Sequence, residues 1–324
     1  MFGIGYSYKV NVSESLKRIG ELTIGEYGEK NLREIIAIAQ KVKTFVDHVI
    51  RVRAVEMHES KLTHLRDASA LLRTLTQTKY DHFVGKLQMQ VRDIIVALNA
   101  YASEGSLYLM RHPDKRTKVP GRSLSDKGVK EAKVIGEMIE EEILLSPKPV
   151  LLKIFTSEIS RTQLLAKLIL HINNAKRLEL SEGHLTIDGP REHPALSMGP
   201  VSKDAYTLVE QLSKKYRDPD EAEWEITLSW MNKTDGFDKI INDGGLLDPG
   251  VVFRNLSNFI VESEREIHGT PDKYVIILGL GHSWNIDTVV YPRTKIPDMI
   301  GTTQYAKFEH HHFFYKGRWY PYQS

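Results

Sequence analysis

Apolar residues in the first hundred positions recur at intervals of three and four, which is the period of an amphipathic helix. One apolar stripe covers residues 32–50, a second covers 62–75 and a third covers 83–98. Proline, which would interrupt such helices, is absent from residues 1–112. The pattern therefore predicts that residues 1–104 form a helical N-terminal region, either a bundle of about three long helices or one antiparallel hairpin.

The pattern changes after residue 104. Short apolar runs at residues 107–110, 151–155 and 274–279 are typical of buried strands, and a short strand is also expected at 177–180. Helical spacing is expected at residues 125–141, 163–171, 202–216, 220–231 and 251–267. This alternation predicts that residues 105–324 form an α/β domain, a three-layer and mainly parallel sheet with helices on both faces.

The end of the chain has the pattern of a hairpin. Lys316-Gly317 is suited to a tight turn that joins residues 310–315 to 318–322, at the edge of the sheet or paired with a neighbouring molecule. The consecutive histidines His310, His311 and His312 are a weak metal signal, because alternation along a strand places at most two of them on one face. We therefore expect no metal site here.

The composition excludes several classes of protein. The 324 residues include no cysteine, which excludes disulfides, thiolate catalysis and sulfur-bound metals. A formal net charge of +2 gives no support to nucleic-acid binding. No run of about eighteen apolar residues is present, and the first residues lack the charged start and long apolar core of a signal peptide. We therefore expect a cytoplasmic enzyme that does not contact a membrane.

Polar and charged side chains follow each of the three apolar runs. Arg111 and His112 come directly after the first run, Arg161 follows the second within a few residues, and His282 follows the third. Parallel strands bring their carboxyl ends to the same edge of a sheet, where ligands of α/β proteins bind. Two arginines and two histidines at one edge suit an anion, and we interpret them as a phosphate site.

Four motifs in this order resemble the histidine phosphatase superfamily, the phosphoglycerate-mutase-like enzymes. They are Met110-Arg111-His112 for the family's Arg-His-Gly, residues 124–132 for its Leu-Thr-x-x-Gly-x-x-x-Ala helix start, residues 157–162 for Ser-x-x-x-Arg-Thr, and Gly281-His282-Ser283 for the late His-Gly. The resemblance covers about the last two thirds of the chain.

Three positions depart from the family pattern. Pro113 replaces the glycine after the histidine, which removes a backbone N–H that could contact phosphate. Ser283 stands where the family often has a second glycine, and Leu165 stands where a small hydroxylated residue is common. None of these changes removes a side chain that the chemistry needs.

The chemistry of phosphoryl transfer assigns roles to the four residues at the strand ends. A neutral imidazole attacks phosphorus, and nearby guanidinium groups favour that neutral form, so His112 is the expected nucleophile. Arg111 and Arg161 match the geometry of the phosphoryl oxygens in the transition state. His282 could donate to the same oxygens or orient the nucleophile, and the resemblance implies this role as well.

The resemblance also implies a general acid between the second arginine and the last histidine. Glu192 is the best match, with Asp114 as the alternative. The basic loop after the nucleophile offers Arg116 as a further phosphate ligand, because some family members use a cation there. A solvated basic loop is the alternative interpretation.

The sequence thus predicts a phosphatase that hydrolyses a phosphomonoester through a phosphohistidine on His112, without metal or cofactor. Two alternatives stay open: a mutase-like phosphotransferase that uses the same residues, and a non-catalytic scaffold that binds a phosphorylated ligand. The substrate, a small phosphorylated molecule or a phosphoprotein, is left open because loops set specificity. The N-terminal helices could join two copies of the chain, bind another protein, cap the site or simply pack against the α/β domain.

Overall fold

The computed structural model describes residues 9–24, 28–78, 84–112, 124–174, 178–295 and 305–322. Pro113, Asp114 and Arg116 lie outside the described residues, so the predictions made for them stay predictions.

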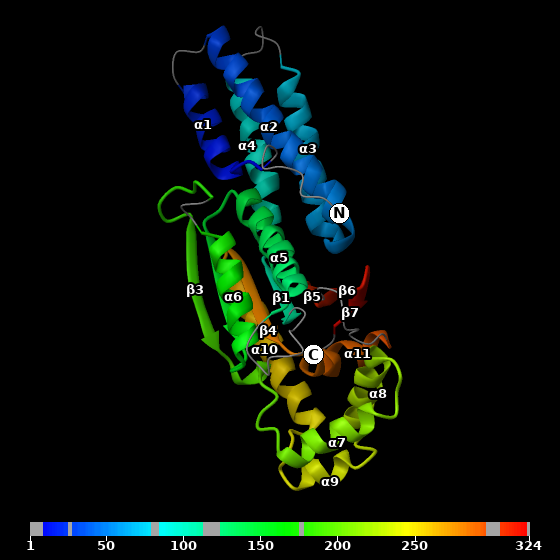
Figure 1. Ribbon diagram of the computed structural model, residues 1–324. Coiled ribbons are helices and arrows are strands. Elements are labelled where there is room, and N and C mark those ends of the chain that lie inside the picture. The colour runs from blue at the N-terminus through cyan, green and yellow to red at the C-terminus, as the bar shows by residue number, and fades with distance from the viewer. Residues whose placement is uncertain are drawn as a thin grey trace.

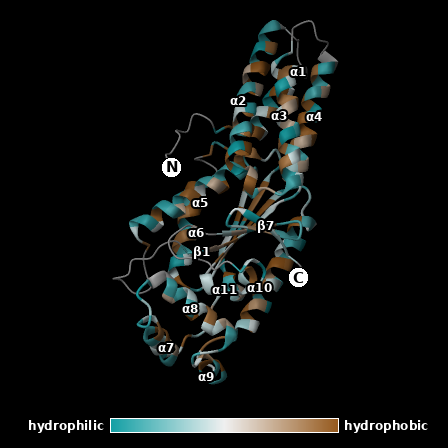
Figure 2. Ribbon diagram, turned by 90° about the vertical axis from the view of Figure 1, so that its right-hand side faces the viewer, coloured by the Kyte–Doolittle hydropathy of each residue, from teal (hydrophilic) through white to brown (hydrophobic). Residues whose placement is uncertain are grey.

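The N-terminal region consists of helices α1 (Val12–Ile24), α2 (Glu29–Arg53), α3 (Glu59–Thr76) and α4 (Val84–Ala102), with a short 3₁₀ turn, η2 (Ala54–Glu56), after α2. They lie side by side as a bundle that projects from one end of the molecule (Figure 1). Figure 2 shows that the helices of this bundle have one apolar and one polar side. Helices α2, α3 and α4 match the three apolar stripes in the sequence. Helix α1 has no counterpart among the predicted helices, and its buried Val12, Leu16 and Ile19 pack in the same core.

A 7-stranded sheet lies at the centre of the remaining described residues. Its strands are β1 (Ser106–Arg111), β2 (Val150–Thr156), β3 (Leu185–Glu192), β4 (Tyr274–Gly281), β5 (Tyr305–Glu309), β6 (His312–Tyr315) and β7 (Arg318–Pro321). They are arranged in the order β3-β2-β4-β1-β5-β6-β7. Strands β3, β2, β4 and β1 run parallel, and β5, β6 and β7 continue the sheet antiparallel beside β1. The expected mainly parallel sheet is confirmed.

Alternate residues of the central strands face opposite layers. Tyr108 and Ile276 pack with α5 (Asp126–Leu145), α6 (Ser160–Ile172) and the N-terminal helices. Leu107 and Ile277 pack on the other face with α10 (Pro249–Gly269) and α11 (Ser283–Thr294). Because both faces are buried, these strands appear in the sequence as continuous apolar runs. Helices on both faces of the sheet confirm the three-layer architecture.

Helices α7 (Lys203–Ser213), α8 (Pro219–Asn232) and α9 (Phe237–Asn242) form a small unit at the opposite end of the sheet from the N-terminal bundle (Figure 1). A separate core cluster that includes Trp230 and Phe237 fills this unit. Met198, which follows the 3₁₀ turn η3 (Pro194–Leu196), joins this cluster, as does Trp284 from α11. The unit therefore packs beside the carboxyl ends of the parallel strands.

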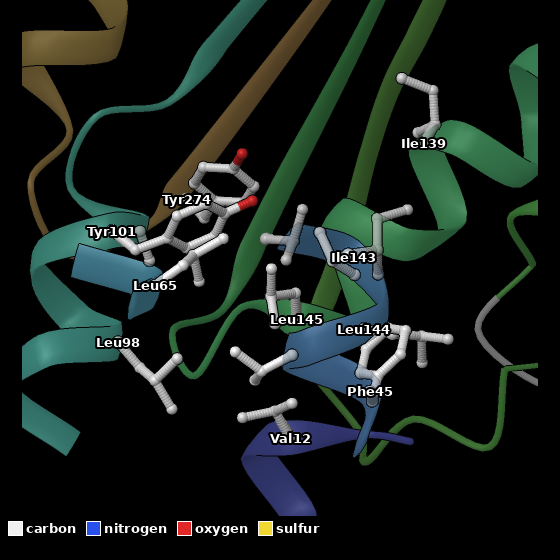
Figure 3. Packing of buried hydrophobic residues seen from close by; sticks show 14 of the residues in the cluster. Val12, Phe45, Leu65, Leu98, Tyr101, Ile139, Ile143, Leu144, Leu145 and Tyr274 are labelled. Atoms are coloured by element: carbon white, nitrogen blue, oxygen red, sulfur yellow. The ribbon is translucent and has the colours of Figure 1, made fainter. Parts of the chain in front are cut away.

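The bundle and the sheet share one continuous core. This cluster runs from Val12 in α1 to Leu280 in β4 and includes side chains of α5 and α6. Figure 3 shows the junction, where Tyr101 from α4 lies against Tyr274 from β4 with ring centroids 5.8 Å apart. Packing is thus continuous across residue 104, where the sequence pattern changes.

A buried polar network lies at the same junction. Lys61 Nζ of α3 donates to Glu309 Oε1 of β5 and to the Tyr274 hydroxyl, both at 3.0 Å. Lys307 pairs with Glu309 at 2.8 Å and with Glu142 of α5 at 3.3 Å. Although burial lowers it, these two carboxylates raise the pKa of Lys307 above its ordinary value. The network joins the bundle to the amino ends of β1 and β4, and the carboxyl ends of these strands lie at the other edge of the sheet.

The prediction of a strand at residues 177–180 is wrong. The described part, residues 178–180, is a turn and irregular chain in which Glu179 has a positive φ of 51°. The remaining parallel strand is β3, in a segment for which no helix or strand was predicted. Its side chains are half-buried or exposed, and it contains Gly189 and Pro190, which disfavour strands, so no apolar run marks it.

The C-terminal hairpin is confirmed, but the three histidines do not share a strand. Lys316 and Gly317 form the expected turn between β6 and β7, with positive φ values of 45° and 82°. His310 and His311 also have positive φ and form a second turn, between β5 and β6. Alternation along a strand therefore does not apply to them. Across the described ranges, no group of three or more histidine and acidic side chains could hold a metal ion.

Candidate active site

Strand β1 positions the first two candidate residues. Arg111 ends the strand in register with Gly281 of β4, and its side chain is buried. His112 follows immediately, and its backbone N–H donates to the Gly281 carbonyl oxygen at 3.3 Å. This bond extends the pairing by one residue, so the sheet itself holds His112 beside the end of β4.

Strand β4 positions His282 next to His112. The two imidazole rings have centroids 5.6 Å apart and are inclined by 69°. His282 is the N-cap residue of α11, and only 8% of it is exposed. Its Nε2 lies 3.0 Å from Ser157 Oγ, which directly follows β2. Residues from the ends of three adjacent strands therefore meet at this histidine.

Ser157 and Thr162 hold His282 in place. Their hydroxyl oxygens lie 3.0 Å apart, and Thr162 Oγ1 also donates to the Ile159 carbonyl at 2.8 Å. Both side chains are fully buried. They are the serine and threonine of the segment that supplies Arg161. The motif therefore includes two residues that position His282, a role that was not predicted from the sequence. The contact itself was hidden because it joins residues 125 positions apart.

Burial keeps His282 uncharged. Removal from water, together with the positive charge of Arg161, lowers the pKa of His282 to about 4, and the opposing charge of Glu158 does not compensate. At neutral pH the ring therefore carries one N–H and one lone pair. It can donate one hydrogen bond to an anion, but it cannot deliver a proton as an imidazolium ion.

Arg161 is the second residue of α6, and its guanidinium is partly buried. Burial lowers the pKa of this group, whereas the nearby Tyr206 and Glu223 raise it. Arginine nevertheless stays charged in proteins. Among the described residues, the buried Nε of Arg161 has no hydrogen-bond partner. A buried donor left without a partner costs about 1–3 kcal/mol, so an anion that accepts from this atom would be held strongly.

His112, Arg161 and His282 line one cavity of about 250 Å³. The other side chains around it are Met198, Val201, Ala205, Tyr206, Val209, Leu246, Ser283 and Trp284. A few convergent polar groups in a mainly apolar cavity are typical of a small-molecule site. The cavity combines groups suited to a phosphoryl anion with room for an attached carbon skeleton.

Two further predicted residues that the structure describes, Arg111 and Glu192, do not line this cavity. Arg111 is buried one residue before His112, at the end of β1. Glu192 is exposed at the end of β3, where its Oε1 accepts a hydrogen bond from Gln163 Nε2 at 2.8 Å. It lines a separate cavity of about 640 Å³. The structure thus brings together three of the predicted side chains and places the predicted acid at a neighbouring position on the same edge of the sheet.

Comparison with solved structures finds a phosphoglycerate mutase from Bacillus anthracis, with 14% sequence identity, a TM-score of 0.43, and coverage of 69% of this chain and 94% of that chain. A mycobacterial glucosyl-3-phosphoglycerate phosphatase matches with 16% identity, a TM-score of 0.37, and coverage of 63% and 89%. The alpha-ribazole phosphatase from Shigella flexneri matches with 14% identity, a TM-score of 0.37, and coverage of 67% and 94%.

No family model and no curated protein matches the chain. Within the part of the chain that the structure describes, no helix is both long enough and apolar enough to cross a membrane.

Proposed function

We propose that this protein is a phosphatase that hydrolyses a phosphomonoester through a phosphohistidine on His112. The observation that carries the proposal is the meeting of His112, Arg161 and His282, from three separate segments, around one cavity. Each has a use in phosphoryl transfer: one imidazole attacks phosphorus, and the other two groups donate to the phosphoryl oxygens. The chemistry assigns no step to a metal ion.

In the first step, an imidazole nitrogen of His112 attacks phosphorus while the bond from phosphorus to the alcohol oxygen breaks. The departing alkoxide takes a proton from a general acid, which this proposal assigns to Glu192. Gln163, the partner of Glu192, lies on the same turn of α6 as Arg161. In the second step, Glu192 accepts a proton from water as the water oxygen attacks the phosphohistidine. The bond between phosphorus and nitrogen then breaks, and inorganic phosphate leaves.

Arg161 and His282 stabilise the charge that the phosphoryl oxygens carry. The Nε of Arg161 offers a buried donor, and the neutral His282 offers its single N–H. Arg111, next to the nucleophile in the chain, adds a second positive charge that attracts the phosphoryl anion. Ser157 acts through His282 as a positioning residue, because its hydroxyl fixes the orientation of the ring.

The test of the nucleophile is hydrolysis of 4-nitrophenyl phosphate, in the presence of EDTA, by wild type, His112→Ala and His171→Ala. His171 is exposed near the end of α6 and is the matched control for the loss of a histidine. We expect wild type and His171→Ala to be equally active and His112→Ala to be inactive. A rapid quench should trap a phosphoryl group on His112 of the wild type. A wild-type rate in His112→Ala would refute the proposal, and loss of wild-type activity in EDTA would refute its metal independence.

The test of the phosphate ligand is Arg161→Met. Loss of one preorganised donor slows turnover about 10²–10³-fold, and we expect a decrease in kcat of this size. Lys167→Met removes an exposed cation from the same helix and should leave kcat unchanged. Equal effects of the two substitutions would show that Arg161 acts only through the net charge of the surface.

The test of the general acid compares leaving groups. An alkyl alkoxide needs a proton to depart, whereas 4-nitrophenolate does not. Glu192→Gln should therefore slow hydrolysis of an alkyl phosphate about 10²–10⁴-fold and that of 4-nitrophenyl phosphate much less. Equal slowing of both substrates would show that Glu192 is not the acid.

A further inference from the structure

The cavity beside the phosphate ligands is apolar, and this property bears on the kind of alcohol that leaves. Six of the described side chains that line it are apolar, and the others are His112, Arg161, Tyr206, His282 and Ser283. In the described part of the chain, no aspartate, glutamate or lysine lines it. A polyol or a second phosphate would leave polar groups without partners against such a wall, which is costly. An apolar carbon skeleton would instead gain from burial there.

We propose that the substrate is the phosphate monoester of a small apolar alcohol or phenol. Its carbon skeleton fills the cavity while its phosphoryl group meets His112, Arg161 and His282. This inference rests on the proposed function, because it identifies the leaving group of that reaction.

The apolar wall is part of a packed core. Trp284 stacks on Trp230 with ring centroids 5.0 Å apart and an inclination of 26°. Trp230 is fully buried, and its Nε1 donates to the Leu247 carbonyl at 3.0 Å. Met198 and Leu246 belong to the same cluster, which fills the unit of α7, α8 and α9. Since side chains in a packed core keep their rotamers, the wall has its shape before a ligand binds.

One turn of chain supplies both a phosphate donor and the aromatic wall. His282, Ser283 and Trp284 are consecutive residues at the start of α11. Ser283 Oγ donates to Glu223 Oε1 at 3.3 Å, which ties this turn to α8. The position of the phosphoryl group and the position of the apolar skeleton are therefore set by the same segment.

The volume of the cavity limits the size of the alcohol. An apolar cavity of about 150 Å³ is large enough to hold benzene. The observed cavity of about 250 Å³ therefore has room for a phosphoryl group together with one ring or a short alkyl chain. A much larger skeleton would extend past Tyr206, which is 64% exposed.

The test measures the affinity of the full chain for n-alkylphosphonates of increasing length by calorimetry. The carbon–phosphorus bond is not hydrolysed, and the charge of the headgroup is the same throughout, so only the chain length changes. One buried methylene is worth about 0.8 kcal/mol, which is about fourfold in affinity. We expect Kd to fall about fourfold per carbon and then stop falling once the cavity is full. A Kd that does not depend on chain length would overturn the inference.

A cavity-filling variant tests where the alkyl chain binds. Ala205 is buried on α7 and lines the cavity, and Ala205→Leu adds about three carbons to the wall. We expect the chain length at which affinity stops rising to shorten by about three carbons. Ala70→Leu, at an exposed position on α3, is the matched control and should leave the series unchanged. An unchanged series in Ala205→Leu would show that the alkyl chain binds elsewhere.

Hydrolysis of 4-nitrophenyl phosphate by the same preparation separates this inference from the proposed function. Turnover without a chain-length effect would overturn the inference and leave the phosphatase proposal standing. A chain-length effect without turnover of any phosphomonoester would overturn the phosphatase proposal and would still support an apolar phosphoryl ligand.

Discussion

Mild acid should destabilise the folded protein through His282, and the size of this effect follows from the burial of the ring. Burial and the charge of Arg161 lower the pKa of His282 to about 4, from an ordinary histidine value of about 6.5. The interval is about 2.5 pH units, and each unit is worth about 1.4 kcal/mol. The full contribution of this residue is therefore about 3–4 kcal/mol.

The direction of this pH dependence is set by whether the folded or the unfolded state binds the proton first as the pH falls. Between about pH 6.5 and about pH 4, the unfolded chain takes up a proton at His282 and the folded protein does not. The free energy of unfolding therefore rises with pH in this window, and the contribution of His282 is lost as the pH falls. Above about pH 6.5 both states are neutral at this residue, so its contribution does not vary with pH.

The variant His282→Gln isolates this contribution. A glutamine amide can take the place of Nε2 beside Ser157, and it does not titrate. We expect the urea unfolding free energy of wild type, minus that of the variant, to be constant above about pH 6.5 and to fall by about 1.4 kcal/mol per pH unit below it. Groups that titrate in both proteins cancel in this difference. A difference that stays constant down to about pH 4.5 would refute the reasoning that burial holds the ring neutral.

Lys61→Met should lower the free energy of unfolding by about 3–5 kcal/mol in a urea titration, because it takes a buried cation away from the buried Glu309. A loss well below about 1 kcal/mol would contradict this expectation. Ser125→Ala removes the N-cap of α5 and should cost about 1 kcal/mol by the same method, whereas Ser125→Asp should retain most of the stability. Glu104→Gln should lower the pKa of His310, which the Glu104 carboxylate raises, and an NMR titration of the ring protons would measure this. An unchanged pKa would show that the 3.1 Å pair does not form.

The strands that carry the site could be predicted because their side chains are mainly apolar and buried or half-buried. Strands β1, β2 and β4 lie next to one another in the interior of the sheet. Strands β1 and β4 are buried along their whole length, so each is a run of apolar residues that ends at a polar one. Strand β2 alternates buried and half-buried residues, and its apolar run is interrupted by Lys153. The parallel direction of these strands then places their ends at one edge. For this reason the positions of Arg111, His112 and His282 at that edge follow from the sequence alone.

The edge strand and the cavity wall could not be predicted in this way. Strand β3 has a neighbour on one side only, and its exposed side chains leave no apolar run in the sequence. The wall brings Val201, Leu246 and Trp284 together from three segments. Each segment shows an ordinary helix or loop pattern by itself. Their proximity depends on how α7, α8 and α9 fold back over the strand ends, and no local period encodes that arrangement.

The burial of charged side chains could not be predicted from the sequence either, and it changes the interpretation of the N-terminal helices. A lysine in an amphipathic pattern predicts a solvated face, yet Lys61 and Lys307 are fully buried. Lys61 links the helical region before residue 104 to the sheet after it, because it donates to Ser106 Oγ of β1 at 2.9 Å as well as to Glu309. Strand β1 therefore begins in this network and ends at His112. Through that strand the helical region supports the position of the proposed nucleophile, although no motif in the first hundred residues points to the site.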